Sequence, residues 1–289
     1  MNINLGNVGN ITQPLSKLVE AIRSGTGMVY QPLHKVLMAK ADAKALDIAD
    51  EAAHARQQRA IERLGHQELR RQERIDAVVN EARRMLPESV SATPVDPDWI
   101  TRFFSDCQDV SDTDLQALWG RILAAEVSAP GTCSRRALTV LRDLSSAEAA
   151  LFRDFLAYCW SYDGWLYSII GGSKSLHDYG FKYGDQLTLE NHGLISIGDC
   201  HWEWNHGDRI DYMSRQHYLL RRGSGKVGGI PVIPLTRAGN EIARVVTPEP
   251  REDYYLDCLS TFQYHRAIAV SPWPRHSATS WKWAVPEES

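Results

Sequence analysis

A long stretch of the chain lacks residues that break helices. No proline occurs between Pro32 and Pro87, and Gly65 is the only glycine in that interval. Lys, Arg, Glu, Gln and Ala dominate the stretch, and all five favour helix. Roughly fifty residues of continuous helix would extend about 75 Å at about 1.5 Å per residue, which exceeds the edge of an ordinary compact domain. The segment must therefore bend, project into solvent or find a partner.

Three arrangements of this long helix are open. It can form an intramolecular hairpin by bending near Gly65, it can project as a solvated helix, or it can associate with a partner. Its apolar face is thin and rich in alanine, as at Ala41, Ala45 and Ala52. Small side chains of this kind allow helices to approach closely. We expect self-association or a protein partner through this helix.

Prolines mark the expected domain boundary. Residues 87–98 contain Pro87, Pro94 and Pro97, which prevent continued helix and are typical of a linker. The expected organisation is a short helix plus the long helix in residues 1–86, a linker over 87–98, a helical bundle over 98–160 and an α+β region over 161–289.

Capping signals define the helices of the expected bundle. Asp98 can cap its first helix, and Ser111 with Asp114 resembles a capping box for the second. Ser145 with Glu148 forms an S-x-x-E box, which is typical of a helix start. The expected helices are therefore 98–106, 111–127, 134–144 and 145–158.

Short strand-like segments appear after residue 160, where glycine and aromatic residues become more frequent. Two helices, over 185–192 and 236–246, are expected among them. The expected strands are 165–170, 194–197, 202–204, 218–221 and 230–235. The chain is thus predicted to be mainly α with a small β component (α+β).

Composition argues against several classes of protein. No apolar run reaches the roughly eighteen residues that cross a bilayer, and the N-terminus lacks a secretory signal. We therefore expect a cytoplasmic protein. The five cysteines are odd in number and never arranged as C-x-x-C, which argues against a disulfide framework and a cysteine zinc site. The net charge of −4 does not favour nucleic acid as a partner.

Glu126 is the sharpest single feature. On a helix it shares an apolar face with Trp119, where an unpaired carboxylate is costly. The tight turn over 130–131 would bring Arg135 and Arg136 back towards it. We predict a buried ion pair that fixes the angle between two helices, and prefer it to a catalytic role because no second titratable group accompanies Glu126.

The densest group of metal-binding residue types spans Cys200 to Asp208. In a strand, His201 and Glu203 would lie on one face, and Cys200 and His206 on the other. Because the ligands are split between faces, we predict no metal site there. The chain also lacks HExxH and G-x-S-x-G motifs, so we predict no catalytic residue and no cofactor. A metal-dependent hydrolase built on this segment is the weakest alternative.

Two further groups are candidates for contact with a macromolecule. Arg221, Arg222 and Lys226 surround a glycine-rich segment that lacks the GxxxxGK[ST] phosphate loop. A hairpin tip is expected there, with contact to a nucleic-acid backbone as the alternative. The C-terminal tryptophans can dock a partner or fold back onto the protein; they are Trp273, Trp281 and Trp283.

Three motifs resemble a winged-helix domain. They are Leu144-Ser-Ser-Ala-Glu148, Leu189-x-x-x-Gly193-Leu194-Ile195 and Leu235-Thr236-Arg-Ala-Gly239. The resemblance covers residues 144–246 and implies that fold. The candidate recognition helix contains Asp185 and Glu190 but no Lys or Arg, so the fold would suit a protein interaction better than DNA reading.

A second resemblance covers nearly the whole chain. The segments that carry it are Leu15 to Tyr30-x-Pro32, Ala39-Lys-Ala-Asp-Ala43, Trp119-x-x-x-Leu123-Ala124-x-Glu126, Pro130-Gly131-x-x-Ser134-x-Arg136 and Leu144-Ser145. They resemble an uncharacterised bacterial family of unknown function. The N-terminal part is more distantly similar to the alpha-type abortive-infection proteins of phage resistance. Neither resemblance implies catalytic residues.

The expected function follows from these features together. We expect a non-enzymatic, oligomeric interaction or scaffold protein, with bacterial antiviral defence as the implied setting. The alternative is a nucleic-acid-binding winged-helix regulator that uses Arg221, Arg222 and Lys226.

Overall fold

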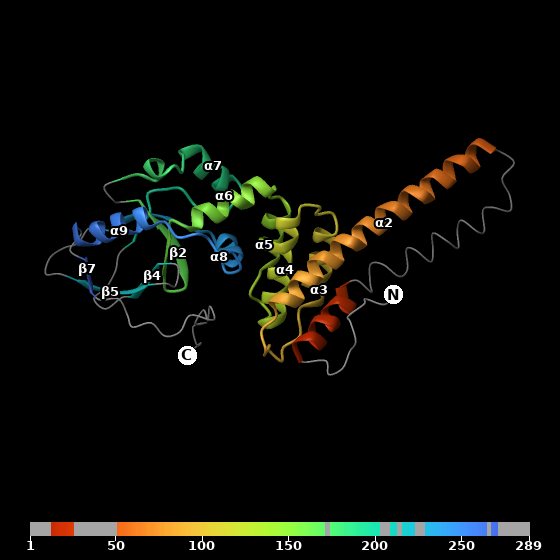
Figure 1. The fold of residues 1–289 in the computed structure, drawn as a ribbon, viewed down its shortest axis with the longest axis horizontal. Helices are drawn as coiled ribbons and strands as arrows, with labels where there is room; N and C mark the ends of the chain where they lie inside the picture. The colour runs from red at the N-terminus through yellow and green to blue at the C-terminus, as the bar shows by residue number, and fades with distance from the viewer. Residues whose placement is uncertain are drawn as a thin grey trace. The chain divides into compact units, whose positions relative to one another are not determined.

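The computed structural model describes residues 13–25, 51–170, 174–202, 209–212, 216–222, 229–264 and 267–270. The chain divides into two compact units, Met1–Arg142 and Asp143–Ser289. The described residues are mostly helical with a smaller antiparallel sheet, which confirms the predicted α+β class (Figure 1).

The first unit consists of helices and connecting loops in the residues described. A helix over residues 13–25 precedes α2 (Glu51–Met85), α3 (Pro97–Cys107), α4 (Thr113–Ser128) and α5 (Arg135–Arg142). Helix α2 has 35 residues and runs through Gly65 without a break, so the described residues do not adopt the hairpin at Gly65 that was one of the three open arrangements. The part of the predicted long helix before Glu51 lies outside the described residues.

Helices α2 and α4 approach each other closely at Gly120. A Cβ at Gly120 of α4 would lie 2.6 Å from the Cβ of Glu81 and 2.8 Å from the carbonyl oxygen of Val78, both on α2. Only a residue without a side chain allows that spacing. Aromatic rings fill the space beside it, since the Phe103 and Trp119 ring centroids are 5.2 Å apart and both residues are buried.

Two helix starts differ from the prediction. Asp96, rather than Asp98, caps α3 and accepts a hydrogen bond of 2.9 Å from the Asp98 backbone N–H. Asp112, rather than Ser111, caps α4. In both places an aspartate lies directly before the first helical residues, where its short carboxylate reaches their free N–H groups. The predicted capping box of Ser145 and Glu148 is confirmed at the start of α6.

The predicted linker over 87–98 lies inside the first unit. The backbone N–H of Ser91 donates to the carbonyl of Ser128 at 2.9 Å, and the Lys17 ammonium donates to the carbonyl of Thr93 at 2.8 Å. The division between the units instead falls between Arg142 and Asp143, where the sequence contains no proline.

The second unit combines an antiparallel sheet with short helices (Figure 1). In the described residues the strand order is β3-β6-β2-β1-β4-β5-β7. The strands are β1 (Cys159–Tyr162), β2 (Trp165–Ile169), β3 (His201–Trp202), β4 (Arg209–Tyr212), β5 (Gln216–Arg222), β6 (Ile230–Pro234) and β7 (Ala267–Val270). The helices are α6 (Ser146–Leu156), η1 (Leu176–Tyr179), α7 (Tyr183–Asn191), α8 (Arg237–Ala243) and α9 (Glu252–Tyr264).

Buried phenol groups hold α9 to the sheet. The Tyr254 hydroxyl accepts from the Ile169 N–H at 3.0 Å and donates to the Tyr158 carbonyl at 2.8 Å. The Tyr212 hydroxyl accepts from the backbone N–H of Arg251, directly before α9, at 3.1 Å and donates to the Ala157 carbonyl at 2.8 Å. Burial raises the pKa of Tyr254 well above its usual value, so these phenols stay protonated and act as structural hydrogen-bond donors.

Gly120→Ala should destabilise the protein even though alanine favours helix over glycine. The added Cβ would overlap Glu81 and the Val78 carbonyl, and overpacking of this kind costs about 1–3 kcal/mol. Thermal unfolding followed by circular dichroism should show a lower midpoint, by about 2–4 °C for each kcal/mol.

Gly65→Ala is the matched control, because a Cβ there meets nothing within 4 Å. Without a clash, the helix propensity of alanine should raise stability by about 1 kcal/mol. A midpoint for Gly120→Ala that equals or exceeds the wild-type value would contradict the close α2–α4 contact.

Candidate interaction surface

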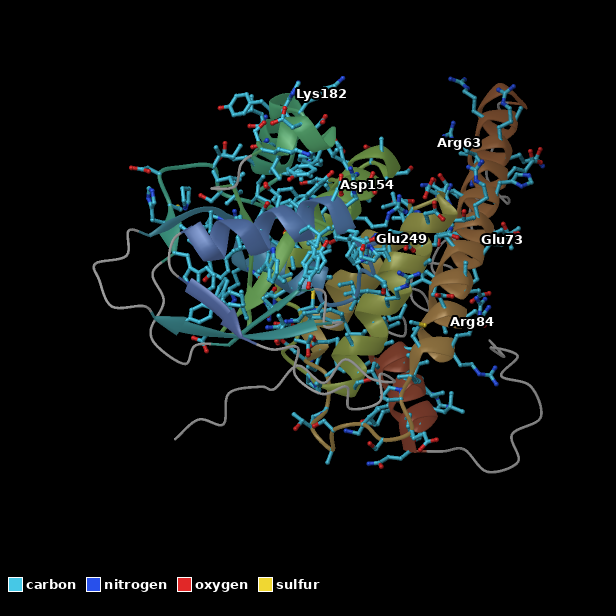
Figure 2. All side chains as sticks on the ribbon, turned by 60° about the vertical axis from the view of Figure 1, so that its left-hand side comes forward. Arg63, Glu73, Arg84, Asp154, Lys182 and Glu249 are labelled. Atoms are coloured by element: carbon cyan, nitrogen blue, oxygen red, sulfur yellow. The ribbon has the colours of Figure 1, made fainter. Side chains whose placement is uncertain are left out.

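Helix α2 has two halves with different surroundings. In its C-terminal half, Ile75, Val78, Val79 and Ala82 are buried. Over residues 55–70, which we call the exposed half of α2, none of the side chains is buried. Figure 1 shows this half extending beyond the other labelled helices of its unit, and Figure 2 labels Arg63 within it.

The buried face of α2 continues into the exposed half. Ile75, Val78 and Ala82 lie at alternating spacings of three and four, which places them on one face. The same alternation leads back through residues 71 and 68 to Leu64 and Ile61. Leu64 is 37% exposed, although it lies on the face that α4 covers further along. We call Ile61 and Leu64 the apolar stripe.

A charged cluster marks the transition between the two halves. The Arg71 guanidinium donates to both carboxylate oxygens of Asp109, at 2.9 and 3.1 Å, and to Glu68 at 3.2 Å. These hydrogen bonds, those to Asp109 foremost, raise the pKa of Arg71. Arg74 adds a bond of 3.2 Å to the Asp109 carbonyl. Because Asp109 is more than half exposed, the cluster adds orientation more than stability.

The structure places Glu126 at the predicted turn but with different partners. Its carboxylate is buried and accepts from the backbone N–H of Gly131 at 2.7 Å and of Cys133 at 2.9 Å. Gly131 adopts a φ of 91°, which is why a glycine is favoured there. The carboxylate thereby holds the α4–α5 turn through backbone amides, a role that charge-assisted hydrogen bonds perform well.

Arg135 and Arg136 lie elsewhere than predicted. The Arg135 guanidinium is 3.0 Å from Asp96 and 3.3 Å from Asp98, and it lowers the pKa of Asp96. Arg136 is exposed. The described contacts therefore differ from the predicted Glu126–arginine pair, because backbone amides reach the carboxylate across the tight turn before either side chain does.

Most other candidate residues lie outside the described side chains. Arg221 and Arg222 belong to β5, where only the backbone is described, and Lys226 falls outside altogether. Trp273, Trp281, Trp283 and residues 203–208 also fall outside. His201 Nδ1 lies 3.3 Å from the Asp199 carboxylate. In the described residues no group of three or more His, Cys, Asp and Glu side chains is placed to hold a metal ion.

One polar contact between α6 and α7 was not predicted. The Glu148 carboxylate accepts from the Ser145 N–H and hydroxyl, both at 2.7 Å, and lies 2.8 Å from His192 Nε2. These groups lower the pKa of Glu148 to about 2. The sequence shows the capping box, but residues 44 positions apart cannot be paired without the fold. The contact joins α6 to the C-terminal end of α7.

Comparison with known proteins places the chain in one family. The sequence model of a family described as "Protein of unknown function (DUF2806)" matches residues 58–259, which is more than half of the chain. The chain matches no curated protein and no solved structure. Among the helices of the described residues, none combines the length and apolar character that a membrane crossing requires.

Glu126→Gln should lower stability by about 1–3 kcal/mol. The amide can accept with one atom only, so a backbone N–H at the turn would lose its acceptor. Thermal unfolding measures the change, and Glu62→Gln is the control because Glu62 is exposed on α2 and should shift stability by less than about 0.5 kcal/mol. Equal midpoints for the two variants would refute the role given to Glu126.

Proposed function

The chain belongs to the DUF2806 family, and we propose that it acts as a non-enzymatic scaffold that associates with a second copy of itself through α2. One observation carries the proposal: the face that α4 covers at Ile75 and Val78 continues as Ile61 and Leu64 with no side chain of the exposed half buried. Covering these apolar side chains with a partner would stabilise the associated state, because it removes their surface from water.

A second copy suits this stripe because the stripe can meet itself. In an antiparallel pair related by a twofold axis, Ile61 of each copy would lie opposite Leu64 of the other. Ala60 and Gly65 flank the same region, and their small size permits close approach of the helices. The stripe is short, so we expect a reversible dimer whose population depends on protein concentration.

The C-terminal unit supplies a second surface in this proposal. Residues 144–246 contain α6, β1, β2, η1, α7, β3, β4, β5, β6 and α8 in that order, and the winged-helix resemblance of this segment makes α7 its candidate recognition helix. Helix α7 exposes Tyr183 by 60% and, one turn later, Leu187 by 38%. It also carries Asp185 and Glu190 and no Lys or Arg. We infer that α7 contacts a protein, because aromatic and apolar groups beside acidic ones disfavour a phosphate backbone.

Glutamate at the apolar stripe should abolish the dimer. Multi-angle light scattering at about 10–200 μM, bracketing the weak affinity expected of so small an interface, should show wild-type mass rising towards twice the monomer value. The double variant Ile61→Glu/Leu64→Glu should remain monomeric, because burying paired carboxylates at the interface is costly.

Leu69→Glu is the matched control. Leu69 is 65% exposed but lies about 140° round the helix axis from Leu64, at about 100° per residue. Its variant should dimerise like wild type. A wild-type protein that stays monomeric throughout would overturn the proposal, and a double variant that still dimerises would exclude the stripe as the interface.

The resemblance to abortive-infection proteins extends the proposal to phage defence. Bacteria expressing the wild-type chain should then form fewer plaques than bacteria carrying an empty vector. Ile61→Glu/Leu64→Glu should lose protection through assembly, and Tyr183→Ala/Leu187→Ala should lose it while still dimerising. Unchanged plaque counts with the wild-type chain across a panel of phages would refute the defence role.

A further inference from the structure

We propose that the exposed half of α2 binds the phosphate backbone of nucleic acid through a row of cationic side chains. The row consists of four arginines and one histidine, Arg56, Arg59, Arg63, His66 and Arg70, of which the arginines carry the positive charge. Successive members are three or four residues apart, so all of them lie on one side of the helix. Each one is exposed. We call this row the arginine face, and Figure 2 labels Arg63 at its middle.

The arginine face and the apolar stripe lie on different sides of α2. At about 100° per residue, the mean direction of Arg59, Arg63 and Arg70 is about 150° from the direction midway between Ile61 and Leu64. A partner on one side therefore leaves the other side open. The inference goes beyond the proposed dimer and does not depend on it.

The arginines in the two halves of α2 differ in whether they form ion pairs with carboxylates. In the packed half, Arg71 is bound to Asp109 at 2.9 Å and Arg84 to Glu81 at 2.8 Å. In the exposed half, the described residues give the guanidinium groups of Arg59, Arg63 and Arg70 no ion pair. Their charges are thus not neutralised within the part of the protein described.

Acidic residues do not interrupt the row. Glu62 points to its flank, about 80° from the mean direction of the arginines, and Glu68 lies on the side of the apolar stripe, where it is 3.2 Å from Arg71. The cationic side chains consequently act together on one side of the helix, and the net charge of −4 for the whole chain does not reveal them.

The chemistry of the row fits nucleic acid better than a protein partner. From Arg56 to Arg70 the row extends about 21 Å along the helix axis, and each strand of a duplex presents one phosphate charge per about 3.4 Å. Arginine binds phosphate oxygens in a bidentate manner. A protein interface would need an apolar or aromatic centre, and this row has none.

The expected binding is independent of base sequence. A row of guanidinium groups contacts phosphates, which position a nucleic acid without reading it. Affinity should therefore fall in the range of nonspecific binding, about 10⁻⁴ to 10⁻⁶ M near physiological salt, and should weaken steeply as salt increases.

Fluorescence anisotropy with the full-length chain tests the inference. The probes are a fluorescent DNA duplex of about 30 base pairs and a single-stranded RNA of equal length. Binding is measured at about 50 and 200 mM salt, because affinity that comes from phosphate contacts falls as salt increases. We expect wild type to bind at least one probe, and the triple variant Arg59→Gln/Arg63→Gln/Arg70→Gln to bind it at least tenfold more weakly. On duplex DNA the salt slope should fall by about 0.9 per lost contact.

The matched control removes three charges elsewhere. Arg83→Gln/Arg84→Gln/Arg153→Gln changes net charge equally, and all three of its arginines are exposed, so its affinity should change by less than about twofold if the row is specific. Circular dichroism should show both triple variants folded. Three results would overturn the inference: no binding by wild type at 50 mM salt, equal losses in the two triple variants, or equal binding of polyglutamate, which would indicate an acidic protein partner.

Discussion

The approach of α2 to α4 at Gly120 is the contact on which the first unit depends. The α4 backbone comes so near Glu81 and Val78 that no Cβ fits between them. This contact fixes the distance between the two helices and the rotation of α2 about its own axis. That rotation decides which side of α2 is buried. Ile75, Val78 and Ala82 are buried, and α4 approaches α2 at Val78 and Glu81. By helical periodicity Ile61 and Leu64 then continue the buried line outside the packed region. The surface proposed for assembly is therefore a consequence of the core.

A helix that is buried along only part of its length needs other reasons to persist over the rest. Residues 55–70 are mainly Arg, Gln, Glu and Ala, which have high helix propensity, and the packed half supplies the nucleus that an isolated helix must form at a cost. The Arg71–Asp109 contact holds α2 to the loop between α3 and α4 where burial stops. The exposed half can thus remain helical although none of its described side chains is buried.

How much the sequence predicts depends on how local the signal is. The Ser145–Glu148 capping box and strand β2 were predicted because their signals lie within a few residues. Asp163 and Gly164 have φ values of 48° and 74° and join β1 to β2, and this Asp-Gly turn is a recognisable hairpin signal. It was missed because the prediction assigned no element between the helix over 145–158 and the strand over 165–170. Strand β1 was missed with it, and helix α9 was also not predicted.

Long-range contacts explain the remaining differences. Glu126 was predicted to be buried at a tight turn, which the structure bears out, but its described partners are the amides of Gly131 and Cys133. Whether an amide or a guanidinium reaches a carboxylate first depends on turn geometry, which residue types alone do not specify. The same limit applies to Arg71 and Asp109, and to Glu148 and His192, whose side chains meet only after their helices have packed.

The arginine face shows how total charge can mislead about partners. The chain carries 32 basic and 36 acidic residues, and that balance argues against nucleic acid only if the charges are mixed on the surface. On α2 they are not: carboxylates pair with Arg71 and Arg84 in the packed half, and the exposed half keeps its arginines in one row. Screening limits electrostatic interactions at physiological salt to about 8 Å, so a polyanion beside this row responds to the row rather than to distant acidic residues. The separation of basic from acidic side chains on one side of α2 is therefore a better guide to a nucleic-acid partner than the net charge of the whole chain.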